Sequence, residues 1–148
     1  MHENEHAVEI RASPPVVFPY LVEGEHRLGW MGALAETTAL SDGPPAVGSR
    51  WRDVFEQLGH RVTLEAELVA FEPPRHLKVR LSSRSVEGSS EQWLEQLDGR
   101  TRVRTILTTR FKSYAARAAA PFIVHHAQRQ LEADLDSLKE LVERESGS

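Results

Sequence analysis

Cysteine is absent from this sequence of 148 residues. Its absence excludes a disulfide framework, a thiolate nucleophile and a metal site with thiolate ligands. No apolar run approaches the ~20 residues that a membrane-spanning helix needs, so we expect no stable membrane insertion. Positive charge is not in excess either, since the formal net charge is -4 and the pI is about 6.0. Without a basic field, we expect no nucleic-acid partner.

Motifs for cofactors and for common catalytic machinery are also missing. The sequence has no Walker loop, no dinucleotide-binding fingerprint, no G-x-S-x-G and no Ser-His-Asp spacing, so we expect no cofactor. The first residues are polar and acidic and do not resemble a secretory signal, which predicts a cytoplasmic protein. The length fits a single domain over residues 1–148 that can bury its own core. The sequence leaves the oligomeric state open between monomer and dimer.

A regular series of strand-length runs follows the N-terminus. The stretch from Glu5 to Arg11 alternates like a strand, and Ser13-Pro14-Pro15 then predicts a short helix with Ser13 as its N-cap. A second helical piece is expected over 25–30. Turn signals such as Asp98-Gly99 separate six further runs, which predict an antiparallel meander. These runs cover 33–40, 48–57, 61–71, 76–84, 90–97 and 101–112.

The last segment changes to helical spacing. Apolar residues from Tyr114 to Val142 recur as on one face of a helix, which should begin between Ser113 and Pro121. Such a helix must bury its apolar stripe against the sheet. The sequence therefore predicts an α+β fold. In this fold a curved antiparallel sheet of about seven strands wraps around a long C-terminal helix, and two short helices follow the first strand.

Period-two alternation assigns the inner face of each strand. The inner sets are mainly apolar, but several carry a polar member, at Asp53, Ser83, Glu95, Thr105 and Thr109. A curved sheet and one helix leave space between them, and apolar walls with a few convergent polar groups are typical of ligand pockets. Alternatively, the Ser and Thr side chains satisfy local partners, and a bulge turns either carboxylate outward.

The residues that we expect to line this cavity lie on the inner strand faces and on the sheet side of the last helix. They are Trp51, Asp53, Phe55, Leu64, Val79, Leu81, Trp93, Thr105, Leu107, Thr109, Phe111, Val124, Ala127 and Leu131. Asp53 and Glu95 are the candidates for acid–base catalysis, because a carboxyl group in an apolar pocket can exchange protons with a bound substrate.

Three further polar patterns have simpler explanations than catalysis. Residues 2–6 spell H-E-x-x-H, but they feed a strand instead of lying on a helix and have no third ligand nearby, so we expect no metal site. His125 and His126 point about 100° apart on the last helix and are expected at the surface or at the cavity rim. Asp134 lies close to the apolar stripe, and we expect it to pair with an arginine.

The order of elements resembles the START/Bet v 1-like (SRPBCC) superfamily, and within it the bacterial polyketide cyclase/dehydrase-like proteins. The resemblance spans nearly the whole chain, and its motifs are structural turns and caps with no catalytic signature. They are the segment Ala12–Phe18, Trp30, the segments Val47–Arg50, Phe71–Leu77 and Gly99–Val103, and the end of the last helix over Leu131–Glu143. The resemblance implies a helix-grip fold with a hydrophobic tunnel between the sheet and the last helix. Members of this superfamily include lipid carriers, hormone receptors, aromatase/cyclases and chaperone activators.

Three hypotheses for function follow. The first is the binding of an apolar or aromatic small molecule, such as a polyketide, a lipid or an isoprenoid, in the cavity. The second is an enzyme of the polyketide cyclase/dehydratase type that uses the same cavity. The third is a protein-interaction module of the chaperone-activator type that uses the outer face of the sheet. A collapsed cavity would favour the third hypothesis.

Overall fold

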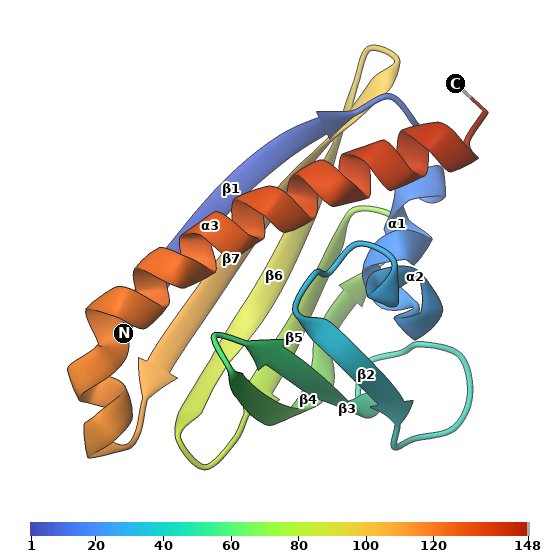
Figure 1. Ribbon diagram of the computed structural model, residues 1–148. Coiled ribbons are helices and arrows are strands. Elements are labelled where there is room, and N and C mark those ends of the chain that lie inside the picture. Colours follow the sequence, from blue (N-terminus) through green and yellow to red (C-terminus); the bar gives the residue numbers. More distant parts are fainter. Residues whose placement is uncertain (148) are drawn as a thin grey trace.

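The computed structural model describes residues 1–147 and confirms the predicted fold class. Seven strands form one antiparallel sheet in the order β1-β7-β6-β5-β4-β3-β2. The sheet curves around the long helix α3, which lies across its concave face (Figure 1). The elements are β1 His2–Ile10, α1 Pro14–Val22, α2 Gly24–Leu28, β2 Leu34–Ala39, β3 Arg50–Gln57, β4 His60–Glu72, β5 His76–Ser82, β6 Val86–Leu97, β7 Arg100–Phe111 and α3 Tyr114–Glu145.

Tight turns set the register of the hairpins. Two residues, Asp98 and Gly99, join β6 to β7, and Gly99 has a φ of 69°. Leu58 and Gly59 join β3 to β4 with φ values of 53° and 76°. A two-residue loop with positive φ matches the right-handed twist of the flanking strands, which is why such loops favour hairpins. The predicted hairpin at Asp98-Gly99 is therefore confirmed.

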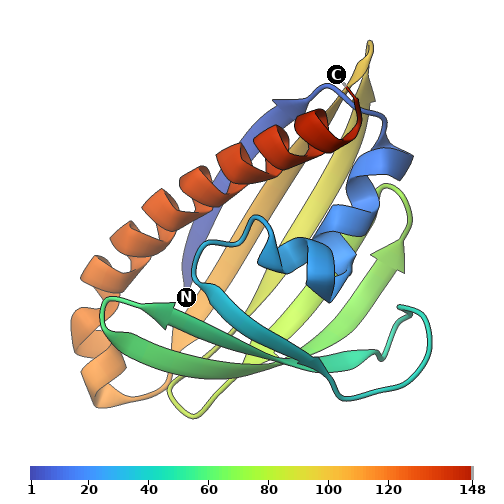
Figure 2. The same ribbon diagram turned by 45° about the vertical axis from the view of Figure 1, so that its right-hand side comes forward.

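The two short helices lie together beside the C-terminal end of α3, where they close one end of the curved sheet (Figure 2). Pro14 occupies the start of α1, as expected, because the first helical residue has no use for its N–H. Ser13 has the extended backbone of an N-cap, although its side chain makes no capping hydrogen bond. Val17 and Leu21 of α1 belong to the main core.

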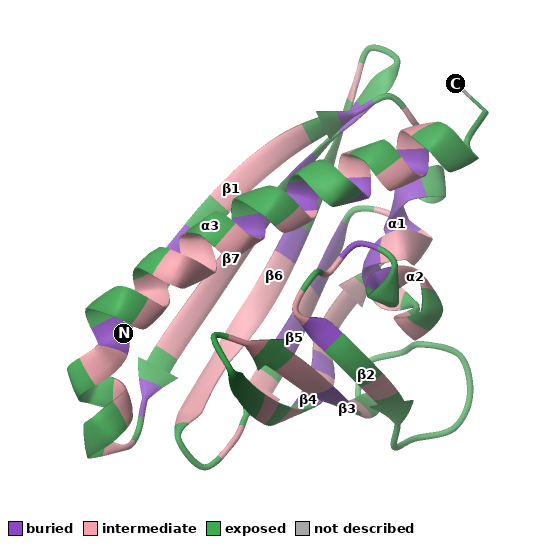
Figure 3. Cartoon of the chain, viewed as in Figure 1, coloured by how far each residue is buried: buried purple, intermediate pink, exposed green. Residues whose placement is uncertain are grey.

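Helix α3 is anchored mainly by its C-terminal half. Ser113 caps its start, because the Ser113 hydroxyl accepts a hydrogen bond from the backbone N–H of Ala116 at 3.1 Å. The buried stripe of the second half faces the sheet (Figure 3) and consists of Leu131, Leu135, Leu138 and Val142. The only buried residue of the first half is Ala120. Among the described residues, no helix combines the length and the apolarity that a bilayer crossing requires.

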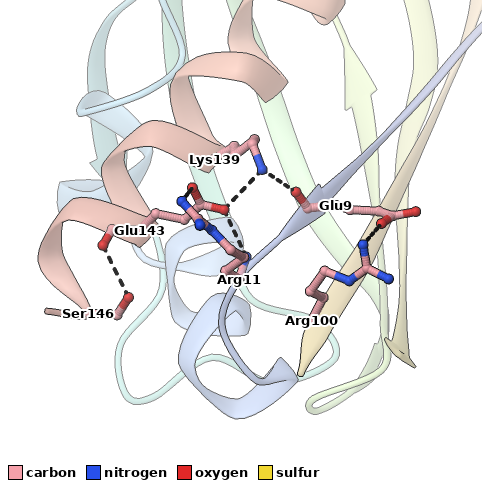
Figure 4. A network of polar contacts seen from close by, with 6 residues as sticks. All are labelled: Glu9, Arg11, Arg100, Lys139, Glu143 and Ser146. Atoms are coloured by element: carbon pink, nitrogen blue, oxygen red, sulfur yellow. Dashed lines mark hydrogen bonds and ion pairs between the residues drawn. The ribbon is translucent and has the colours of Figure 1, made fainter. Parts of the chain in front are cut away.

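A network of polar contacts fastens the last turns of α3 to the end of β1 (Figure 4). Lys139 Nζ donates to the carbonyl oxygen of Glu9 at 2.7 Å and lies 3.0 Å from a carboxylate oxygen of Glu143. The backbone N–H of Arg11 donates to Glu143 at 2.8 Å, and this hydrogen bond is the main cause that lowers the pKa of the Glu143 carboxyl. These contacts hold the C-terminal end of α3 against β1.

Two inner-face predictions need correction. In β4 the register shifts between Leu68 and Ala70, which places Phe71 opposite the inward Leu77 and Ala70 opposite Lys78. The bulge adds one residue, so the side chains after it change face. Strict period-two alternation along this strand would place Ala70 on the inner face with Leu64, but Phe71 packs on the core instead. In β6 the predicted alternation is reversed, which changes the set of side chains that face the helix.

Candidate functional site

A cavity of about 380 Å³ lies between the sheet and α3. Its wall is built mainly from apolar and aromatic side chains of β3 to β7, α3 and the α2–β2 connection. The structure places most of the predicted lining residues in this wall. They are Trp51, Asp53, Phe55, Leu64, Val79, Leu81, Thr105, Leu107, Thr109, Phe111, Ala127 and Leu131. That these side chains bind a ligand remains a prediction.

The structure contradicts the predicted inward placement of Trp93 and Glu95. Both side chains lie on the outer face, because Gln92 and Leu94 of β6 are buried and alternate with them. Trp93 remains 43% exposed and stacks on the ring of His76, with the ring centroids 3.7 Å apart. An aromatic residue usually marks the buried face of a strand, but stacking on a neighbouring ring allows Trp93 to lie outside. Glu95 therefore cannot act in the cavity.

Val124 is also absent from the cavity wall. Its backbone carbonyl accepts a hydrogen bond from Asn4 Nδ2 of β1 at 3.1 Å. Successive residues of a helix point about 100° apart. Ile123 lines the cavity. The face of α3 that lines the cavity therefore includes Ile123 and Ala127 but not Val124.

Asp53 forms a buried ion pair with Arg27 of α2. Arg27 Nη2 lies 2.5 Å from Asp53 Oδ2, Nη1 donates to Oδ1 at 3.3 Å, and Trp51 Nε1 donates to Oδ2 at 3.2 Å. The side chains of Arg27 and Asp53 are only 9% and 1% exposed. Both carboxylate oxygens are thus engaged, which leaves Asp53 poorly placed to exchange a proton with a substrate. The role of Arg27 was not predicted from the sequence. The available signal was that a carboxylate placed on the inner face, such as Asp53, needs a cationic partner.

Asp134 of α3 also lies in the cavity wall, where it is the second aspartate besides Asp53 of β3. It accepts hydrogen bonds from the backbone N–H of Gly32 at 2.9 Å and from Gln130 Nε2 at 2.8 Å. Burial raises its pKa above the ordinary value, and these two hydrogen bonds only partly offset that effect. The predicted pairing with an arginine is wrong. Instead, Asp134 ties the α2–β2 connection to the helix.

Polar residues of β6 complete the wall and were not predicted. Ser90 and Gln92 face the cavity, and Gln92 stands directly opposite Thr105 of β7 in the sheet register. Leu94 was the signal that could have found them. Leu94, Gln92 and Ser90 alternate as regularly as Trp93 and Glu95, so assigning Leu94 to the inner face would have placed Gln92 and Ser90 in the wall.

The histidine patterns assemble no metal site in the described part of the chain. Within residues 1–147, no three His, Cys, Asp or Glu side chains are grouped so that they could hold an ion. The H-E-x-x-H residues lie on β1, which begins at His2 and not at Glu5 as predicted, and none of them lies on a helix. His125 is exposed and His126 is half-buried, and neither belongs to the cavity wall.

Solved structures share this fold at low sequence identity. The protein TTHA0849 of Thermus thermophilus is 16% identical, with a TM-score of 0.84 over 99% of this chain and 100% of that chain. A START superfamily protein of Mycobacterium smegmatis is 16% identical, with a TM-score of 0.82 over 97% and 99%. The Zhui aromatase/cyclase of Streptomyces sp. R1128 is 18% identical, with a TM-score of 0.79 over 99% and 96%. At these identities the likeness shows the fold alone.

Comparison with known sequences gives the family. No curated protein matches this sequence. The family model described as "Polyketide cyclase / dehydrase and lipid transport" matches residues 1–143. Because this match covers nearly the whole chain, the protein belongs to the polyketide cyclase/dehydrase and lipid transport family.

Proposed function

We propose that this protein binds an apolar or aromatic small molecule of the polyketide, lipid or isoprenoid class in the cavity between the sheet and α3. The observation that carries the proposal is the cavity itself, which has a volume of about 380 Å³ and a mainly apolar wall. Ligand pockets in proteins typically measure about 300–1,000 Å³ and combine such walls with a few polar groups. The description of the matching family, which names polyketide chemistry and lipid transport, supports the same class of ligand.

Tryptophan positions allow a direct test. Trp51 lies in the cavity wall, whereas Trp93 lies on the outer face of the sheet. Pyrene is a suitable probe because it is apolar and polycyclic, and its own emission reports the polarity of its surroundings. We expect pyrene to bind saturably to the wild-type protein. Trp51→Ala should weaken binding on the order of tenfold, which corresponds to ~1.4 kcal/mol.

Trp93→Ala is the matched control and should leave the dissociation constant of pyrene unchanged. Circular dichroism of both variants checks that they fold. The proposal fails if pyrene does not bind saturably to the wild-type protein, or if the two substitutions weaken binding equally.

A second candidate function is acid–base catalysis on a polyketide-like substrate, and Asp134 is the observation in its favour. Asp134 has no ion-pair partner among residues 1–147, lies in the cavity wall and has a raised pKa, as suits a proton carrier. In a dehydration, its carboxylate would take a proton from a carbon next to a carbonyl group. It would then return that proton to the departing hydroxyl group, which leaves as water.

Asp134→Asn separates the two candidates. If Asp134 is catalytic, this variant keeps the affinity for pyrene and loses the dehydration of a β-hydroxyketone substrate, followed by the absorbance of the conjugated product. If wild type and variant are both inactive while pyrene binds, the protein is a carrier. The interaction module has no comparable support, because the space between sheet and helix is not collapsed.

A further inference from the structure

Strands β6 and β7 lay a stripe of uncharged polar side chains across the floor of the cavity. Ser90 and Gln92 come from β6, and Thr105 and Thr109 come from β7. The antiparallel register places Gln92 directly opposite Thr105, whereas Ser90 faces Leu107 and Thr109 faces Gly88. Opposite residues of neighbouring strands have Cβ atoms about 4.5–5.5 Å apart, close enough to act on one ligand group together.

Thr105 carries an unsatisfied hydroxyl group into this stripe. The residue is 2% exposed, and its Oγ1 atom has no hydrogen-bond partner among the described residues. Buried polar atoms almost always have a partner, and leaving one unpaired is unfavourable. Because Thr105 also lines the cavity, a molecule in the cavity is the natural source of the missing partner.

Gln92 stands next to this hydroxyl and is itself buried, with an exposed fraction of 8%. Its Nε2 donates to Ser90 Oγ at 3.3 Å, a long hydrogen bond that holds the amide along the stripe. An amide oxygen accepts hydrogen bonds, whereas a threonine hydroxyl can donate or accept. Together, Gln92 and Thr105 can satisfy a group that both donates and accepts, or one that only accepts.

The charges near the stripe limit the kind of ligand group that can bind there. The stripe itself has no cation, and the guanidinium of Arg27 is already paired with both oxygens of Asp53. Burying a carboxylate or a phosphate beside Thr105 would therefore remove its hydration without supplying a counter-ion, which is costly. A hydroxyl or a carbonyl group carries no charge, and hydrogen bonds from Thr105 and Gln92 can replace those it loses with water.

We propose that the ligand carries an uncharged oxygen function, a hydroxyl or a ketone, and that Thr105 and Gln92 bind it on the cavity floor. This inference rests on the proposed function and refines it. The ligand class becomes that of neutral oxygenated apolar molecules, such as cyclised polyketides or isoprenoid alcohols, as opposed to fatty acids and phospholipids. The rest of the cavity holds the apolar body of the molecule.

Three probes with one ring system test the proposal. They are pyrene, 1-hydroxypyrene and 1-pyrenecarboxylate, which present no polar group, a neutral hydroxyl and a charged carboxylate. Dissociation constants are measured from pyrene emission for the wild-type protein and for Thr105→Val, which keeps the side-chain shape and removes the hydroxyl. Thr63→Val makes the same chemical change at an exposed position of β4 and serves as the control.

We expect the preference for 1-hydroxypyrene over pyrene to fall about tenfold in Thr105→Val, in keeping with the loss of one buried hydrogen bond. The affinity for pyrene should not weaken, because valine is at least as apolar as threonine. Thr63→Val should keep the wild-type preference. The carboxylate should bind most weakly to the wild-type protein.

Different outcomes separate this inference from the proposed function. If Thr105→Val keeps the wild-type preference for 1-hydroxypyrene, or if the carboxylate binds most tightly, the polar subsite is wrong while the cavity remains a binding site. If none of the three probes binds the wild-type protein saturably, the proposed function itself fails and the subsite fails with it.

Discussion

Arg27 and Asp53 bring opposite charges into the interior beside the cavity. Moving a charge out of water is costly, and here the cost is offset by two guanidinium contacts and by the indole N–H of Trp51. The pair thereby fixes the short helix α2 against β3. Its main role in this structure is positional, because neither charge is left free.

Asp53→Asn should therefore destabilise the protein strongly. The substitution leaves the Arg27 guanidinium buried without a counter-ion, and breaking such a pair costs about 3–5 kcal/mol. Urea unfolding followed by circular dichroism measures the change. Glu65→Gln breaks an exposed ion pair with Arg50 and is the control, with an expected loss below about 1 kcal/mol. A loss for Asp53→Asn no larger than that of the control would contradict the structural role.

Asp134 should make the free energy of unfolding fall as pH rises, whereas a carboxylate in an ion pair ordinarily makes it rise. Its pKa in the folded protein is raised above the reference value of 3.8 by burial. Between 3.8 and the raised pKa, the folded state binds more protons than the unfolded state, so the free energy of unfolding falls as pH rises through this window. Asp134→Asn removes this fall.

The measurement compares the free energies of unfolding of the wild-type protein and Asp134→Asn from below pH 3.8 to neutrality. We expect the variant to gain stability relative to wild type as pH rises and the difference to level off once Asp134 is ionised. A difference that is constant over the whole range would show that burial does not perturb this carboxyl group.

At the scale of elements, the last turns of α3 are packed in the core, whereas the α3 residues that line the cavity lie between Ala116 and Leu135. Leu138 is 0% exposed and sits in the core, whereas Leu131 is 6% exposed and also lines the cavity. Replacing a buried leucine by alanine costs about 2–5 kcal/mol, with the highest values where a new void opens in a tightly packed region.

Leu138→Ala should therefore lie in the upper part of that range, and Leu131→Ala should cost less, because Leu131 already borders empty space. Chemical denaturation of both variants gives the two values. An equal loss for both, or a loss below about half a kcal/mol for Leu138→Ala, would contradict this division of the helix.

Sequence patterns predicted most elements, because turn residues and hydrophobic period are local properties. The backbone preferences of Asp98-Gly99 favour a hairpin without help from distant residues. The spacing of Leu131, Leu135 and Leu138 likewise predicts a helix from local sequence alone. The face of β6 was not predictable in this way. Trp93 lies outside because His76 of another strand stacks on it. The partner of Asp53 was also not predictable from local sequence, since Arg27 lies on a short helix distant in sequence.

At the scale of the whole molecule, the fold leaves space that a tightly packed interior would fill. Close packing is a main source of stability, so the side chains that line a cavity of about 380 Å³ lack some of the dispersion contacts that they would make in a packed core. A ligand that enters the cavity restores these contacts in the folded state only. Binding and stability are therefore linked, and the linkage distinguishes a binding cavity from an accidental void.

Ala127→Phe tests this linkage, because Ala127 faces the cavity from α3 and a phenyl ring there would occupy part of the empty volume. For the wild-type protein, a pyrene concentration of about 100 times the dissociation constant should raise the free energy of unfolding by about 2.7 kcal/mol. We expect Ala127→Phe to keep the stability of the unliganded protein, since it fills space instead of opening it, and to lose most of the gain from pyrene. Ala118→Phe adds the same ring at an exposed position of the same helix and should keep the full gain. If pyrene stabilises Ala127→Phe as much as Ala118→Phe, the probe binds elsewhere on the protein, and the space between sheet and helix is only a packing defect.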